Sequence, residues 1–155
     1  REILRVAARG VMLFAPLVFA AGEAGADSFP LANANPKWQA ECGACHLAYP
    51  PQLLPAASWR RMMAALDRHF GSDAGVDAAT AAEIGGYLER NAATGKRANT
   101  SALRITEADW FVREHRKVSA ATWTLPAVKS AANCASCHTA AAQGDYRERN
   151  IRVPR

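Results

Sequence analysis

The pentapeptide Cys-x-x-Cys-His occurs twice in this chain, and the two copies contain all four of its cysteines. The first copy spans residues 42–46 and the second spans residues 134–138. Two thiols at this spacing can each form a thioether bond with one vinyl group of a haem, and the histidine that follows is then placed to bind the iron. The repeated motif therefore predicts two covalently bound haem c groups. The residues involved are Cys42, Cys45, Cys134 and Cys137 for attachment, with His46 and His138 as the proximal iron ligands.

Other uses of paired cysteines fit this sequence less well. The two pairs of a four-cysteine zinc site are normally about 15–20 residues apart, and a thioredoxin-like motif needs a βαβ setting. Here the pairs are much farther apart, and no strand-rich segment flanks either one. Two disulfide bonds remain an alternative in an oxidising compartment, but they leave His46 and His138 without a role.

Residues 1–26 have the composition of a secretory signal peptide. Three arginines precede the apolar run of residues 11–21, and Ala24-Gly25-Ala26 resembles a cleavage site. A membrane-spanning helix needs about 20 apolar residues, so a retained anchor is the weaker alternative. Export agrees with haem attachment, which takes place outside the cytoplasm and, in bacteria, on the periplasmic side. We therefore predict a periplasmic protein.

The sequence of residues 27–155 predicts a mainly α fold. In this fold two small helical haem-binding halves pack together, with long loops and little or no sheet. The halves are residues 27–92 and 104–155, joined by a linker at residues 93–103. With the linker shared between them, the 129 residues from 27 to 155 make halves of about 65 residues each, a size at which a core of side chains alone is marginal, so the haem is expected to serve as core. Capping residues and prolines predict helices. The expected helices are 36–42, 58–70, 77–91, 106–117 and 125–134.

Two histidines remain for the two open axial positions of the irons. His69 lies 23 residues after His46, and His115 lies 23 residues before His138. This spacing predicts that His46 and His69 bind one iron and that His115 and His138 bind the other, in opposite order along the chain. Crossed pairing stays open, as does a role for His69 and His115 as hydrogen-bonded core residues.

Met62 and Met63 are competing ligands for the first iron, since a thioether ligand would give that haem a higher potential than a second histidine. Adjacent methionines on one helix face more often fill gaps in a core. The predicted face that carries these methionines also ends in His69, so we favour the histidine as the distal ligand.

Charge is divided unevenly between the halves. Residues 27–92 carry a net charge of −2, whereas residues 93–155 carry eleven basic and five acidic side chains, a net charge of +6. A basic surface can bind nucleic acid, but in an exported haem protein we interpret it as a docking face for an acidic redox partner, because complementary charge speeds encounter. A solvated basic surface without any partner is the alternative.

Beyond these motifs, the chain resembles the bacterial dihaem cytochromes c that donate electrons to a small oxygen-binding monohaem cytochrome c. The likeness is carried by Tyr-Pro-Pro after the first haem motif, by Ser-Trp and His-Phe-Gly in residues 58–71, and by residues 104–146. The resemblance implies bis-histidine haems, electron transfer, and a membrane b-type cytochrome as a neighbouring carrier.

We therefore predict a low-potential periplasmic electron carrier with no catalytic residues. Its partners are other redox proteins, with no binding of nucleic acid and no stable membrane insertion after signal cleavage. The main alternative is a dihaem peroxidase or reductase in which one distal histidine, most readily His115, moves away to open an iron site. A haem-based sensor or a fragment of a larger multihaem assembly is the weakest alternative, because this length contains no visible signalling module.

Overall fold

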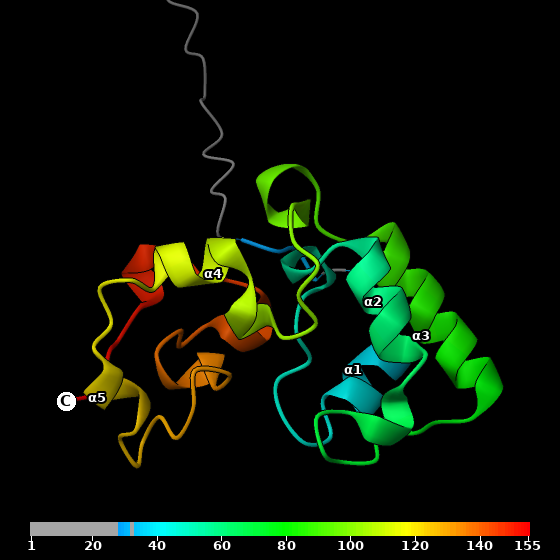
Figure 1. The fold of residues 1–155 in the computed structure, drawn as a ribbon, viewed down its shortest axis with the longest axis horizontal. Helices are drawn as coiled ribbons and strands as arrows, with labels where there is room; N and C mark the ends of the chain where they lie inside the picture. The colour runs from blue at the N-terminus through cyan, green and yellow to red at the C-terminus, as the bar shows by residue number, and fades with distance from the viewer. Residues whose placement is uncertain (1–27, 32) are drawn as a thin grey trace, which may run out of the picture.

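Short helices and long loops form two lobes that lie side by side in the computed structural model, which describes residues 28–31 and 33–155 (Figure 1). One lobe holds α1 (Pro36–Cys42), α2 (Ala56–Met63) and α3 (Ala78–Arg90), and the other holds α4 (Asp109–Glu114) and α5 (Ala120–Trp123). In the described part of the chain, β pairing is limited to isolated bridges. The predicted mainly α fold is confirmed.

Turns of 3-10 helix lie between and after the α-helices, at Pro51–Leu53, Leu66–Arg68, Gly95–Ala98, Ile105–Glu107, Cys134–Ser136, Ala141–Gln143 and Glu148–Asn150.

In the first lobe, α3 packs against both α1 and α2, and its buried face presents Ile84 and Leu88. The predicted starts of α1 and α3 are confirmed. Both could be predicted because each depends on a cap formed by neighbouring residues. The Asn35 side chain accepts a hydrogen bond from the backbone N–H of Trp38 at 2.9 Å, and the Asp77 carboxylate accepts two from the first turn of α3. These bonds satisfy amide groups that have no partner within the helix.

The predicted helix over residues 58–70 is wrong at both ends. It begins at Ala56, where the Pro55 carbonyl accepts the first backbone hydrogen bonds, and Ser58 is buried inside it instead of capping it. It ends at Met63, so His69 lies beyond the helix, immediately after a 3-10 turn. The chain then reverses through positive φ angles at Phe70 (51°) and Gly71 (99°).

Helix boundaries in the second lobe also differ from the prediction. The helix expected over residues 106–117 begins later, because Thr106 lies in a 3-10 turn before α4. Helix α4 ends at Glu114, and His115 is its C-cap. The expected helix over residues 125–134 is wrong: the last α-helix is α5, capped by Ser119, and a series of turns follows it to the second haem motif.

One hydrophobic core runs through both lobes. From the first lobe it takes residues of α1, α2 and α3 such as Trp38, Trp59 and Ile84, and from the second it takes Trp110 and Phe111 of α4. Phe29, near the beginning of the described chain, packs into the same cluster and donates a backbone hydrogen bond to Gly144 at 2.7 Å. The two lobes therefore share a single interior.

Residues 1–26, the expected signal peptide, lie outside the described residues, and the division at residues 93–103 stays a prediction. None of the helices in the described ranges is long and apolar enough to cross a membrane.

We expect Gly144→Ala to destabilise the folded protein by at least about 2 kcal/mol, because an L-residue at positive φ costs about 1–2 kcal/mol before any clash is counted. Gly144 has φ of 73°, and an added Cβ would overlap the Phe29 carbonyl oxygen. Chemical denaturation of the haem-loaded protein gives the free energy of unfolding.

Gly95→Ala is the matched control, since Gly95 also has positive φ (58°) but open space around its Cα. The free energy of unfolding of this variant should fall by only about 1 kcal/mol, which is the cost of the backbone conformation alone. Equal losses in the two variants would contradict a close approach at Gly144.

Candidate haem sites

The first Cys-x-x-Cys-His motif lies at the end of α1. Cys42 is the last residue of the helix, Gly43 caps it, and the following turn leads to Cys45 and His46. The second motif begins with a 3-10 turn, in which the His138 N–H donates to the Cys134 carbonyl at 2.8 Å. All four cysteines have free thiols. The expected disulfide alternative is therefore not formed in this structure.

The first cysteine of each motif is partly buried. Burial raises the pKa of Cys42 to about 11, with a smaller effect from Glu41, and burial likewise raises the pKa of Cys134 to about 11. A buried thiolate is costly, whereas a thioether carries no charge and loses little on burial. These positions suit sulfur atoms that end as thioethers.

His46, which follows α1, and His69, which follows the 3-10 turn Leu66–Arg68, come together in the first lobe. Their ring centres are 6.2 Å apart with an interplanar angle of 27°. Nδ1 of His46 lies 2.8 Å from the carbonyl oxygen of Leu47, which leaves Nε2 available. The reversal at Phe70 and Gly71 directs the chain back after His69, an arrangement that the expected helix would not produce. Burial, then the nearby charges of His46 and Arg104, lower the pKa of His69, which favours the neutral imidazole that binds metals.

His115 and His138 form a similar pair in the second lobe. Their ring centres are 6.1 Å apart, with an interplanar angle of 72°. His115 is held by α4, because its Nδ1 lies 2.9 Å from the Phe111 carbonyl oxygen and its ring stacks on the Phe111 ring at 3.9 Å. His138 is positioned by a β-bridge to Ile151 in the C-terminal segment. Each histidine expected as a distal ligand thus lies beside the histidine of the haem motif in its own lobe.

The competing ligands are placed differently. Met62 and Met63 are partly buried on α2 and pack against the hydrophobic core. Among the described residues, no three histidine, cysteine, aspartate or glutamate side chains are grouped so that they could hold a metal ion by themselves. A haem iron takes four ligands from the porphyrin and needs only two from side chains.

The comparisons with known proteins agree with this arrangement. The sequence profile of the dihaem cytochrome c family matches residues 38–146, which include both cysteine pairs and all four histidines. This chain belongs to the dihaem cytochrome c family. Among curated proteins, no sequence matches it.

Two solved structures are closely similar. DHC purified from Rhodobacter sphaeroides has 45% sequence identity and a TM-score of 0.65, over 73% of this chain and 97% of the other. The dihaem cytochrome c of Shewanella baltica has 37% identity and a TM-score of 0.69, over 77% of this chain and 93% of the other. Membership implies electron transfer by two haems, bound at the two cysteine pairs.

The residues around the haem sites of this dihaem cytochrome fit the group in one further respect: aromatic rings contact all four histidines. The ring centre of Phe70 lies 4.8 Å from that of His69. Tyr49 stacks on His46 with ring centres 4.7 Å apart, Tyr146 lies 5.1 Å from His138, and Trp123 lies 5.9 Å from His115. None of these ring contacts was predicted from the sequence. A tyrosine three residues after the first motif was the available signal for Tyr49.

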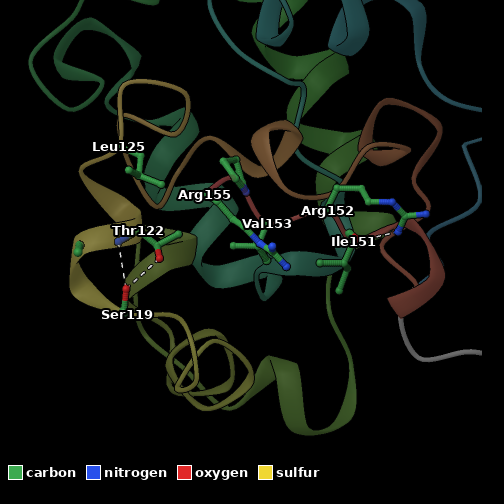
Figure 2. Close-up of a pocket in the computed structure, with 9 residues that line it drawn as sticks. Ser119, Thr122, Leu125, Ile151, Arg152, Val153 and Arg155 are labelled. Carbon is green, nitrogen blue, oxygen red and sulfur yellow. Dashed lines mark hydrogen bonds between the residues drawn. The ribbon is translucent and has the colours of Figure 1, made fainter.

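A groove of about 620 Å³, called here the C-terminal groove, lies beside the second haem motif of the dihaem cytochrome (Figure 2). Residues of the α5 region form one wall and the C-terminal segment forms the other. The Arg152 N–H donates to the Cys137 carbonyl at 2.8 Å, so this segment is joined directly to the motif. The lining residues are Ser119, Ala121, Thr122, Leu125 and residues 151–155.

Proposed function

We propose that this dihaem cytochrome is a periplasmic electron carrier of low potential in which each iron is bound by two histidines. The separation of the histidine rings carries the proposal. A histidine nitrogen binds a metal at about 2 Å and its ring centre lies roughly 1 Å farther back, so two rings on opposite sides of one iron are roughly 6 Å apart. The ring separations of 6.2 Å and 6.1 Å match this value.

Two imidazole ligands determine what such an iron can do. With both axial positions occupied, the iron has no open site for oxygen, peroxide or another substrate, so outer-sphere electron transfer is the reaction that remains. Histidine in place of methionine favours a low potential. A hydrogen bond from Nδ1 of His46 or His115 to a backbone carbonyl makes the imidazole a stronger donor and stabilises the oxidised iron further.

The enzyme alternative would require a distal histidine to leave its iron. His115, the candidate expected from the sequence, is held by the Phe111 carbonyl, by stacking on the Phe111 ring and by the Trp123 ring at 5.9 Å. Releasing it would break these contacts together with the iron bond. The contacts therefore favour the carrier over a peroxidase or reductase.

The partner that this surface fits best is an acidic redox protein. The C-terminal groove has apolar side chains at its centre, with Val153 48% exposed, and arginines 152 and 155 line it. It adjoins the haem attached at Cys137, within the half that carries a net charge of +6. An oxygen-binding monohaem cytochrome c and a membrane b-type cytochrome are the partner classes that the family resemblance suggests.

We expect the oxidised holoprotein to give two distinct low-spin signals in electron paramagnetic resonance. The two imidazole planes of His46 and His69 are near-parallel, at 27°, and this geometry separates the energies of the iron orbitals that overlap with imidazole. The planes of His115 and His138 are near-perpendicular, at 72°, and leave these energies nearly equal. The first pair should therefore give a rhombic signal and the second a signal with a larger g-maximum. Adding CO to the reduced protein should leave its absorbance spectrum unchanged.

The variants His69→Ala and His115→Ala serve as controls for each other. His69→Ala should remove only the rhombic signal and create one high-spin, CO-binding haem, whereas His115→Ala should remove only the signal with the larger g-maximum. Loss of the opposite signal would indicate crossed pairing. Persistence of two low-spin haems in either variant would contradict the ligand assignment.

Charge reversal in the C-terminal groove tests the docking surface. The double variant Arg152→Glu with Arg155→Glu should slow electron transfer to an acidic redox protein at least about tenfold at low ionic strength, because steering by complementary charge raises association rates by this order or more. The Arg152 contact to Cys137 uses its backbone N–H and survives the change. Stopped-flow kinetics over a range of salt concentrations measures the effect.

Arg90→Glu on α3 is the matched control, since Arg90 is an exposed arginine of the first lobe. It should change the rate little. Arg90→Glu makes half the charge change of the double variant, so equal slowing per reversed charge would show that only net charge matters and would contradict docking at the groove.

A further inference from the structure

Tyr49 contacts the haem sites of both lobes. Its ring stacks on His46, with ring centres 4.7 Å apart and an interplanar angle of 23°. Its hydroxyl donates a hydrogen bond to the carbonyl oxygen of Ala132, 83 residues away in the sequence and two residues before Cys134. One side chain therefore joins the proximal histidine of the first site to the attachment segment of the second.

The Ala132 carbonyl connects this hydroxyl to the second attachment cysteine. It also accepts the backbone N–H of Cys134 at 3.0 Å, and the Cys134 sulfur lies 3.7 Å from the same oxygen. The connection from the His46 ring to the sulfur that bonds the second haem thus consists of one ring stack, one side chain and hydrogen bonds to a single oxygen. The two hydrogen bonds to this oxygen, from the Tyr49 hydroxyl and from the Cys134 N–H, bring their heavy atoms closer than a van der Waals contact would. The thioether sulfur of Cys134 carries no proton, so it joins the route through the covalent bonds of Cys134 itself.

The surroundings of Tyr49 hold it in place. Pro50 and Pro51 follow it and are fully buried, and the Trp59 indole N–H donates to the Pro51 carbonyl at 2.7 Å. A tyrosine hydroxyl has a pKa of about 10 and keeps its proton at neutral pH, so it can donate the hydrogen bond to Ala132. The tyrosine is a fixed donor of a hydrogen bond and not an acid or base.

We propose that Tyr49 couples the two haem sites. Its ring and its hydrogen-bonded hydroxyl form the route by which an electron passes from one haem to the other. The proposal rests on the proposed function, because it takes His46 to be an iron ligand. In each event one iron(II) centre is oxidised and the other iron(III) centre is reduced by a single electron. Tyr49 itself is neither oxidised nor deprotonated, and no bond is formed or broken.

Tunnelling explains why the hydroxyl matters. Electron transfer falls off steeply with every gap between bonded groups, and the hydrogen bond to Ala132 closes the gap between the two lobes along this route. Tyr146 lies near the other end, with its ring 5.1 Å from His138, but its buried hydroxyl has no hydrogen-bond partner among the described side chains and backbone. Tyr49 is thus the tyrosine that spans the two sites.

The test uses the holoprotein carrying Tyr49→Phe, which keeps the ring and removes only the hydroxyl. In half-reduced samples, exchange spectroscopy of the haem methyl signals by nuclear magnetic resonance measures the rate of electron exchange between the haems. We expect the rate to fall several-fold while both haems stay low-spin. Tyr49→Leu, which removes the stacked ring as well, should slow the exchange further.

Tyr87→Phe is the matched control, because Tyr87 is a partly buried tyrosine of the first lobe that packs on Trp38 and contacts no haem histidine. Its exchange rate should equal that of the wild type. An unchanged rate in Tyr49→Phe would overturn the coupling role, even if the variant lost stability. If the wild type lacked two low-spin bis-histidine signals, the proposed function would fail first, so the two failures are distinguishable.

Discussion

Covalent attachment of two haems is the constraint on which the rest of this small fold depends. The α-helices are short, from four residues in α5 to thirteen in α3, and isolated helices of this length are marginal in water. A porphyrin fixed at the end of α1 and at the turn of Cys134 gives each lobe a large apolar surface to pack around. The tryptophans and phenylalanines of the shared core then hold the two lobes together.

What the sequence predicted correctly was either local or chemical. Asn35 and Asp77 cap their helices through side-chain bonds within three residues, so neighbouring residues were sufficient to predict both helix starts. The cysteine motifs were interpretable because their chemistry depends on spacing alone. The same reasoning failed for the helix expected to carry His69, since its apolar periodicity continues past Met63 while tertiary packing ends the helix there and reverses the chain at Phe70.

The candidate site illustrates the same division. The count of histidines predicted which side chains would lie close together, and the structure brings them together in each lobe. The sequence placed both His69 and His115 on helix faces, whereas His69 follows a 3-10 turn and His115 lies at the end of a helix. Ring angles and the contact of Tyr49 with Ala132 could not be predicted. The ring angles depend on the local packing of each histidine pair, and the Tyr49 contact depends on how the two lobes dock, which links residues more than eighty positions apart.

This docking makes the two haem sites unequal in ways that suit a relay. Positive charge near an iron stabilises its reduced form, so the half with a net charge of +6 should hold an electron more readily than the half with −2. The near-perpendicular rings also lie in the positive half, beside the C-terminal groove. A pair of equal haems would share an electron evenly. If Tyr49 bridges the sites as proposed, an unequal pair would instead bias the electron toward the haem at the basic surface, where an acidic partner would take it.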